Sequence, residues 1–247
     1  MSREAIDVRR EAKSEESESK TQRVRAKRHP SLLYPLSSPK IKPLGLVEYQ
    51  PTWRAMQDFT ARRDAATPDE LWLLQHFPVY TLGVASKPEH LPRVDQGIPI
   101  VRSDRGGQIT YHGPGQVVVY LLLDLRRRAL SVRPLVRIME QAVVDLLAAH
   151  GIAARGRGDA PGVYVGEAKI AALGLRVRNG CCYHGLALNV EMDLSPFAAI
   201  NPCGYPGLAV TQTRDLGLAE PLAALEAKLV DCLLLRLNAN GTTDEHG

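Results

Sequence analysis

Several signatures of common site types are missing from this chain of 247 residues. The cysteines form no CxxC pair and there is no HExxH motif, so a zinc or similar metal site is not indicated. No GxxxxGKS or GxxxxGKT motif occurs, and no GxGxxG motif leads into a helix, so a phosphate-binding loop is not indicated either. No apolar run approaches the roughly 20 residues that a membrane-spanning helix needs. We therefore expect no metal, no cofactor and no membrane contact.

Cysteine and aromatic residues are also scarce, with four cysteines and an aromatic fraction of 5%. The cysteines lack the spacing of a disulfide framework, and no signal peptide with an apolar core precedes them, so we expect a cytoplasmic protein. The net charge of +4 is mild and the single RGG sequence is not repeated, which argues against nucleic-acid binding. Such a charge also suits an acidic protein partner.

The charge pattern divides the chain. Residues 1–42 carry many charges and almost no apolar side chains, so we expect a disordered, charged N-terminal extension. Residues 43–238 are expected to form one folded domain, and residues 239–247 a frayed C-terminal tail.

Hydrophobic periodicity predicts a mixture of strands and helices within the folded domain. We expect strands at residues 44–49, 71–74, 79–83, 98–102, 117–123, 162–165, 169–178 and 181–190, and helices from Pro51, at 132–150 and at 220–237. Several strand pairs have no helix between them. The sequence therefore predicts the α+β class (α/β mixed), a single domain with a mixed, largely antiparallel sheet flanked by helices.

The stretch from Arg105 to Gln116 has the composition of a binding loop. Four glycines stand there among arginine, glutamine, threonine, tyrosine and histidine. Glycine lets the backbone approach a ligand closely, and the polar side chains can supply contacts. The alternative is an ordinary hairpin loop with Pro114–Gly115 as its turn.

Asn179–Gly180 is a strong signal for a two-residue hairpin between the strands at residues 169–178 and 181–190. Pairing across that turn sets Leu175 opposite His184, Leu173 opposite Leu186 and Lys169 opposite Val190. One face then carries Leu173, Leu175, His184, Leu186 and Leu188, with Lys169 among them, and the other carries Ala172, Gly174, Gly185 and Ala187. We expect a flexible ligand chain to lie on the second, small-sided face.

Two further residues have a setting that suits catalysis. Cys203 lies in a turn between two prolines, which would hold its thiol rigid and accessible. A thiol of pKa about 8.5 needs a neighbouring cation or proton acceptor to act near pH 7, and Lys169, His112 and His184 are available. Lys169 begins an otherwise apolar strand, where an unpaired ammonium is costly. The alternatives are a packing role for Cys203 and an edge-strand role for Lys169.

Four motifs follow one another along the chain: RGGQITYHGPGQ at residues 105–116, GEAKIAALGLRV at 166–177, HGLALNV at 184–190 and NPCGYPG at 201–207. Together they resemble the lipoyl(octanoyl) transferase family, the octanoyltransferases of lipoate biosynthesis. The resemblance extends over about residues 44–237. It implies the fold of lipoate and biotin protein ligase catalytic domains.

The resemblance also implies a reaction, its partners and its site residues. An octanoyl group would move from octanoyl-acyl carrier protein, through a thioester on catalytic Cys203, to the lysine amine of lipoyl domains of 2-oxoacid dehydrogenases and of the glycine cleavage H protein. Lys169 would be the catalytic partner of Cys203, no ATP would be needed, and the enzyme would act as a monomer. The substrate pocket would be lined by Arg105, Gly106, Gly107, Gln108, Ile109, Thr110, Tyr111, His112, Ala172, Leu173, Gly174, His184, Gly185, Leu186 and Ala187.

Three other functions fit parts of the sequence. An ATP-dependent lipoate ligase of the same fold would activate a free acid as an adenylate, and the pairing of Cys203 with Lys169 argues against it. A non-catalytic module that binds fatty acyl groups or lipoyl domains would keep its function after Cys203→Ser. A nucleic-acid-binding protein would use the RGG sequence and the basic arm, for which the aromatic content is low.

Overall fold

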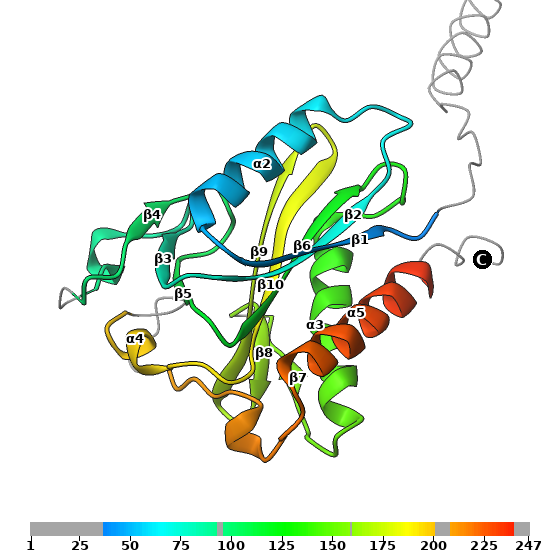
Figure 1. Cartoon of the computed structure of the whole chain (residues 1–247). Helices are drawn as coiled ribbons and strands as arrows, with labels where there is room; N and C mark the ends of the chain where they lie inside the picture. Colours follow the sequence, from blue (N-terminus) through cyan, green and yellow to red (C-terminus); the bar gives the residue numbers. More distant parts are fainter. Residues whose placement is uncertain (1–36, 93–95, 159, 201–207, 240–247) are drawn as a thin grey trace, which may run out of the picture. The chain divides into compact units, whose positions relative to one another are not determined.

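The computed structural model describes residues 37–92, 96–158, 160–200 and 208–239 (Figure 1). Its elements in chain order are β1 (Lys40–Val47), α2 (Tyr49–Arg62), β2 (Glu70–His76), β3 (Val79–Leu82), the 3-10 helix η1 (Pro88–His90), β4 (Ile100–Arg102), β5 (Ile109–His112), β6 (Gln116–Asp124), α3 (Val132–Ala148), β7 (Arg155–Gly156), β8 (Gly162–Val165), β9 (Ala168–Arg178), β10 (Cys181–Asn189), α4 (Ser195–Ala198), the 3-10 helix η3 (Arg214–Leu216) and α5 (Leu222–Ala239).

The central element is a seven-stranded sheet in the order β1-β2-β6-β10-β9-β8-β7. β1 and β2 are parallel, and the other neighbours are antiparallel. A smaller sheet has the order β4-β3-β5, with a parallel β3–β4 pair and an antiparallel β3–β5 pair. The expected α+β class with a mixed, largely antiparallel sheet is therefore confirmed.

The hairpin of β9 and β10 forms at the expected turn. Asn179 and Gly180 have φ values of 51° and 76°, which matches a two-residue turn with both central residues in the left-handed region. The register sets Leu175 opposite His184 and Leu173 opposite Leu186, as expected, but the ladder ends at the Ala171–Leu188 pair and does not reach Lys169 and Val190.

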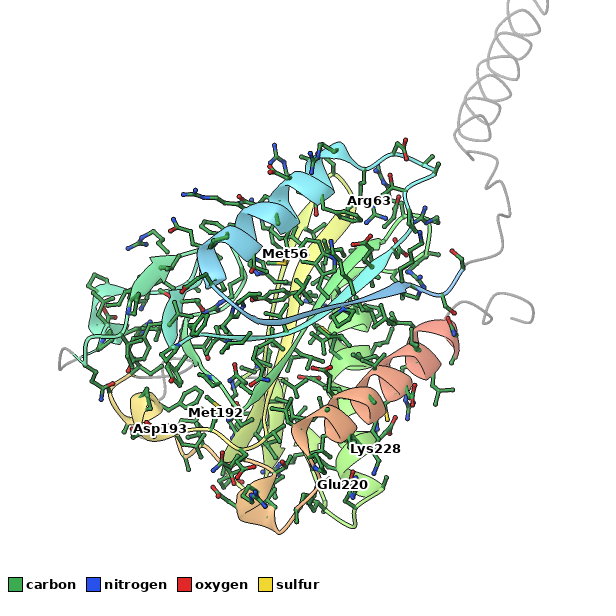
Figure 2. All side chains as sticks on the ribbon, viewed as in Figure 1. Met56, Arg63, Met192, Asp193, Glu220 and Lys228 are labelled. Carbon is green, nitrogen blue, oxygen red and sulfur yellow. The ribbon has the colours of Figure 1, made fainter. Side chains whose placement is uncertain are left out.

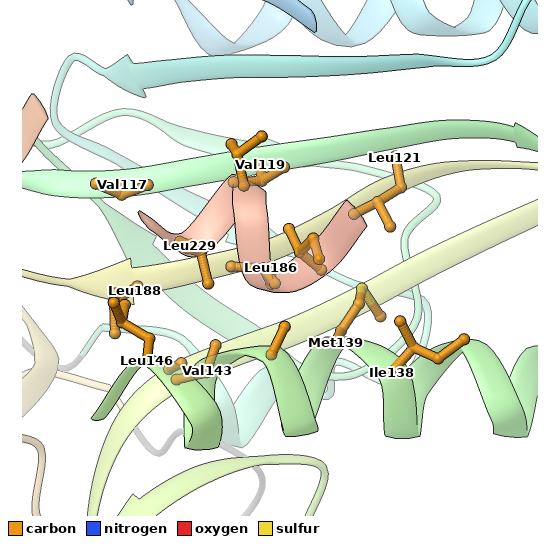
Figure 3. Packing of buried hydrophobic residues seen from close by; sticks show 14 of the residues in the cluster. Val117, Val119, Leu121, Ile138, Met139, Val143, Leu146, Leu186, Leu188 and Leu229 are labelled. Carbon is orange, nitrogen blue, oxygen red and sulfur yellow. The ribbon is translucent and has the colours of Figure 1, made fainter. Parts of the chain in front are cut away.

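Helices cover both faces of the large sheet (Figure 1). Alternate side chains of β6 and β10 pack against α3 and α5, and Figure 3 shows Val119, Leu186, Met139 and Leu229 meeting in this layer. On the other face Met56 of α2, labelled in Figure 2, packs against a cluster that includes Trp72, Leu74, Val118 and Tyr120. Because successive side chains of a strand point to opposite faces, the run from Val117 to Leu123 supplies both layers.

The chain's outer elements extend slightly beyond the expected domain limits. β1 begins at Lys40, within the stretch expected to be disordered, and α5 ends at Ala239. Most side chains of β1 are exposed, so this edge strand forms through backbone pairing with β2 and leaves little apolar signal in the sequence. Within the described ranges, none of the helices has the length and apolar character to cross a membrane.

Candidate active site

A cavity of about 270 Å³ is lined by the β9–β10 hairpin and by the loop that precedes β5. Fifteen of the predicted site residues line it: Arg105, Gly106, Gly107, Gln108, Ile109, Thr110, His112, Lys169, Ala172, Leu173, Gly174, His184, Gly185, Leu186 and Ala187. Residues far apart in sequence thus share one cavity wall. Cys203 lies outside the described residues.

Tyr111 is the exception among the described residues that were predicted to line the pocket. Its neighbours Thr110 and His112 face the cavity, and strand alternation turns Tyr111 the other way. Its ring packs against Tyr80 and Phe197, with ring centroids 5.6 and 5.5 Å away. Tyr111 therefore packs in the apolar cluster of the small sheet and does not line the cavity.

Lys169 is buried, with 6% of its surface exposed, at the start of β9. Its Nζ donates a hydrogen bond to Pro161 O at 3.1 Å and lies 5.4 Å from the ring centroid of Tyr164. Its backbone N–H donates to Ala209 O at 2.8 Å, and its carbonyl accepts from Thr211 N at 2.9 Å. The segment that follows the NPCGYPG motif is therefore bound directly to the backbone of Lys169.

Arg105 has a mainly structural set of contacts. Its guanidinium is buried and donates to Thr81 Oγ1 from Nε at 3.0 Å and to Gly106 O from Nη1 at 3.0 Å. The amide of Gly106 in turn donates to Leu175 O at 2.8 Å. These bonds fix the glycine loop between β3 and the edge of β9, where it forms one wall of the cavity.

A chain of buried hydrogen bonds connects His112 to the segment beside Lys169. His112 Nδ1 donates to Gln116 Oε1 at 2.7 Å, and Gln116 Nε2 donates to Asn189 Oδ1 at 2.9 Å. Asn189 Nδ2 completes the chain by donating to Thr211 O at 3.0 Å. Asn189 lines the cavity and was not among the predicted residues, although it stands within the HGLALNV motif.

Two histidines of this region are held neutral. Burial lowers the pKa of His112 to about 3, and a neighbouring histidine, His76, adds to the effect. Burial also lowers the pKa of His76 to about 4. His76 Nε2 lies 2.7 Å from the hydroxyl of Tyr120, and His76 Nδ1 lies 3.0 Å from Val47 O. A neutral imidazole satisfies both of these bonds.

Asp104 bonds the cavity residue His184 and was not among the predicted residues. Its carboxylate accepts from Trp53 Nε1 at 2.8 Å and Gln57 Nε2 at 3.1 Å, both from α2, and from the hydroxyl of Tyr183 and Nε2 of His184. Burial works to raise the pKa of Asp104, but these hydrogen bonds outweigh it and hold the pKa well below its usual range. Asp104 joins α2, the glycine loop and β10.

His184 corrects the expected arrangement of the hairpin faces. Consecutive strand residues should point to opposite faces, yet Tyr183 and His184 both bond Asp104. The φ of His184 is 63°, which turns its ring out of the Leu173–Leu186 face and toward Tyr120, 5.9 Å away between ring centroids. His184 thus lines the cavity and bonds Asp104 on the same side as Tyr183, which strand alternation does not predict.

No three His, Cys, Asp or Glu side chains come together as a metal site would require across residues 37–92, 96–158, 160–200 and 208–239. The described cavity wall combines two cationic groups, the Lys169 ammonium and the Arg105 guanidinium, with imidazoles, with polar side chains such as Gln108, and with apolar side chains.

Solved structures place this fold in a known class. The chain is similar to lipoate-protein ligase A bound with ATP, with a TM-score of 0.66, 18% identity, and coverage of 81% of this chain and 86% of that one. It is also similar to biotin protein ligase from Aquifex aeolicus, with a TM-score of 0.51, 10% identity, and coverage of 84% of this chain and 73% of that one. The fold is that of lipoate and biotin protein ligase catalytic domains.

Sequence comparison gives the family within this class. The model of the lipoyl protein ligase A/B catalytic domain matches residues 48–230. An octanoyltransferase of Dechloromonas aromatica is 68% identical over 189 residues, 76% of this chain and 91% of the relative. One of Nitrosospira multiformis is 64% identical over 198 residues, 80% of this chain and 92% of the relative. The chain belongs to the lipoyl protein ligase A/B catalytic-domain family and, within it, to the octanoyltransferases, which are acyltransferase enzymes.

Proposed function

We propose that this enzyme moves an octanoyl group from octanoyl-acyl carrier protein to a lysine amine of a lipoyl domain, through a thioester on Cys203. The main support is the setting of Lys169, a buried ammonium on the wall of a largely apolar cavity. Ala209 and Thr211, which closely follow Cys203 in the sequence, are bonded to the Lys169 backbone. The motif that carries the thiol therefore leads into the segment that holds the lysine.

The floor of the cavity fits a flexible hydrocarbon chain. Ala172, Gly174, Gly185 and Ala187 share one face of the hairpin, and all four line the cavity. These side chains leave room above the sheet where larger residues would fill it. Burial of an apolar chain there is favourable by about 0.8 kcal/mol per methylene group.

The wall above that floor can bind a polar part of the donor. Gln108 Oε1 is buried and has no hydrogen-bond partner among the residues that the structure describes. A buried acceptor without a donor is costly. An amide N–H of a bound pantetheine arm would satisfy it, which is consistent with the proposed role of the glycine loop.

The proposed chemistry needs a thiolate and an ammonium. In the first step the Cys203 thiolate attacks the carrier thioester, a new C–S bond forms, and the carrier thiolate leaves and takes a proton from the Lys169 ammonium. In the second step the neutral acceptor amine attacks, an amide forms, and Cys203 leaves as a thiolate while the proton lost by the acceptor passes to the neutral Lys169 amine, which restores the ammonium. The ammonium of Lys169 stabilises the Cys203 thiolate before the first step and again after the second, because an opposite charge nearby favours the ionised thiol.

Backbone amides are the candidates for stabilising the oxyanion that forms when the thioester is attacked. They belong to Gly106, to Gly107 and to the residues around Cys203. The Gly106 amide is already bonded to Leu175 O, and the stretch of β9 from Lys169 to Leu175 spans roughly 20 Å. We therefore assign this role to amides around Cys203 and give the glycine loop a binding role.

The same proposal covers partners, location and domain limits. We infer that the acceptors are lipoyl domains of 2-oxoacid dehydrogenases and the glycine cleavage H protein, and that the enzyme works as a monomer in the reducing cytoplasm, where its thiol stays free. We further infer that the catalytic domain corresponds to residues 40–239, slightly longer than the expected 43–238, and that residues 1–39 and 240–247 are its flanking extension and tail.

Intact-mass measurement after mixing with octanoyl-acyl carrier protein tests this mechanism. We expect one added octanoyl group, mapped to Cys203 and absent in Cys203→Ala. Lys169→Ala should keep the fold and slow acylation about 100-fold or more, whereas Lys228→Ala, an exposed lysine of α5, should have no effect.

Three results would contradict the proposal. They are an octanoyl group on another residue, unchanged acylation in Lys169→Ala, and full transfer activity in Cys203→Ser. Activity that requires ATP and free octanoate would instead identify a ligase.

A further inference from the structure

Residues 209–213, called the inserted segment below, lie beside the start of β9. Lys169 N–H donates to Ala209 O at 2.8 Å, and Lys169 O accepts from Thr211 N–H at 2.9 Å. Lys169 and Val210 thereby form an isolated parallel bridge. Because β9 and β10 stop pairing before they reach Lys169, this place in the sheet is open to another segment, and the inserted segment takes it.

The end of β10 holds the same segment. Thr213 N–H donates to Asn189 O at 3.1 Å, and Thr213 Oγ1 donates to Val190 O at 3.1 Å. The side-chain amide of Asn189 donates from Nδ2 to Thr211 O at 3.0 Å. Thr211 is thus bonded to β9 through its N–H and to the last residue of β10 through its carbonyl. The inserted segment therefore connects the two strands where they no longer pair.

The buried hydrogen-bond chain leaves the Asn189 amide a single orientation. Thr211 O can only accept, so Asn189 presents its NH₂ group to Thr211 and its Oδ1 to Gln116. Gln116 Nε2 donates to that Oδ1 at 2.9 Å, and Gln116 Oε1 accepts from His112 Nδ1 at 2.7 Å. Asn189 and Gln116 are both buried. The loss of one bond would therefore leave a buried polar group unsatisfied, which is costly.

The inserted segment is part of the proposed active site. Val210 lines the cavity, as do Lys169 and Asn189. The segment begins at the second residue after the NPCGYPG motif, residues 201–207. The chain that carries Cys203 therefore continues directly into a part of the cavity wall that Asn189 holds.

We propose that Asn189 is a positioning residue for the acyl transfer, which holds the inserted segment in register with Lys169 through the hydrogen bond between Asn189 and Thr211. The inference rests on the proposed function, in which Cys203 and Lys169 act together. Without the amide donor, Thr211 O loses its bond to β10, and the segment shifts relative to β9. A misplacement of about 1 Å can lower a rate about 100-fold. The floor of the cavity, which belongs to the β9–β10 hairpin, keeps its shape.

The test is single-turnover octanoylation of Cys203 in the full-length chain, measured at increasing concentrations of octanoyl-acyl carrier protein. Asn189→Leu keeps a side chain of similar size, adds no charge and removes the donor to Thr211. We expect the maximal rate to fall about 100-fold and the half-saturating carrier concentration to stay within about twofold. Gln141→Leu is the matched control, because it removes an exposed amide of α3 that donates to Asp145, and it should keep the wild-type values.

Hydrogen exchange measures whether the inserted segment is what moves. In Asn189→Leu the amides of Thr211 and Thr213 should exchange about tenfold faster than in the wild type or more, because their local opening becomes easier. The amide of Val119, in the central strand β6, should keep its rate. A merely structural role of Asn189 would instead speed exchange across the sheet, Val119 included.

The outcomes separate this inference from the proposed function. If the wild type forms no Cys203 thioester, the proposed function fails. If the wild type forms it and Asn189→Leu keeps the wild-type maximal rate, or changes only the half-saturating concentration, the positioning role alone is overturned. If Asn189→Leu does not fold, Asn189→Ala takes its place in both measurements. Amides of Thr211 and Thr213 that exchange in the wild type as fast as unprotected loop amides would also overturn the inference.

Discussion

At the scale of single residues, His184 shows how a local departure from strand geometry creates part of the cavity wall. A left-handed conformation costs a residue other than glycine about 1 kcal/mol. The hydrogen bond between His184 Nε2 and Asp104 Oδ1, at 3.0 Å, offsets that cost because its acceptor is charged. The same carboxylate fixes Trp53 and Gln57 of α2, so one aspartate determines where the glycine loop begins.

The buried histidines predict how stability depends on pH. The pKa of His76 falls to about 4 and that of His112 to about 3 on folding, from about 6.5 in an exposed histidine. The unfolded chain takes up these protons below pH 6.5 and the folded chain does not. The stabilisation is therefore complete above pH 6.5 and is lost as the pH falls toward 4, by about 1.4 kcal/mol per pH unit for each histidine.

Denaturant unfolding at pH 7, 6 and 5 measures this slope. His112→Asn keeps an N–H for Gln116 and removes one of the two titrating histidines, His76 and His112. The part of the fall in unfolding free energy that these two cause between pH 7 and pH 5 should therefore be about half as steep in the variant. The pKa of His184 is also lowered by burial, so His184 adds the same fall in unfolding free energy to the wild type and to His112→Asn. An equal slope in the two proteins would show that His112 is protonated in the folded state.

These residue-level features differ in how far the sequence could predict them. The lysine at the start of an apolar strand and the small residues of the hairpin stood out from their neighbours. Asp104 did not, because a single aspartate before a glycine loop resembles any loop aspartate. Its importance comes from Trp53, Gln57 and Tyr183, which are distant in sequence and meet only in the folded chain.

At the scale of elements, β10 depends on close contact with β6. A Cβ added at Gly185 would lie 2.1 Å from Val119 O and 2.6 Å from Leu121 Cδ1. Since the first of these is backbone, the two central strands would have to separate. The glycine of the HGLALNV motif is thus needed for sheet pairing as well as for the open floor of the cavity.

Gly185→Ala should therefore destabilise the protein by about 3 kcal/mol, as expected for overpacking in a core. Gly158→Ala is the matched control, because no atom of the described residues lies within 4 Å of a Cβ at that position, apart from its chain neighbours. The control should stay within about 0.5 kcal/mol of the wild type. Thermal unfolding of the two variants makes the comparison, and an equal melting temperature would mean that β6 and β10 adjust without cost.

Element boundaries could be predicted where a short stretch of sequence determines them. Asn179–Gly180 predicted the hairpin and its register, because this two-residue turn requires both residues in the left-handed region. The start of β1 was not predictable, since its pairing with β2 is made by backbone. The face of His184 was also not predictable, because strand alternation assumes an extended backbone at every residue.

At the scale of the whole described fold, Asp69 connects segments that pack against opposite faces of the large sheet or lie at its edge. Asp69 Oδ1 lies 2.6 Å from Arg63 Nη2, at the end of α2, and 2.7 Å from Arg127 Nη2, in the loop after β6. Asp69 Oδ2 lies 2.5 Å from Arg128 Nε. Arg128 also donates to Ser37 O at 3.2 Å, which connects the residues just before β1. A single carboxylate therefore holds the edge of the sheet, α2 and the β6–α3 connection.

Asp69→Asn should cost about 3–5 kcal/mol, because it leaves buried guanidinium groups without a counter-charge. The side chains of Asp69, Arg63 and Arg128 are each at most 3% exposed, so water cannot replace the lost carboxylate. The matched control is Lys228→Ala, which breaks the exposed ion pair with Glu220 that Figure 2 labels and should cost less than about 1 kcal/mol. Urea unfolding followed by both fluorescence and circular dichroism gives the two free energies. Equal losses would contradict the assignment, and separate transitions in Asp69→Asn would show that the cluster also couples α2 to the rest of the sheet.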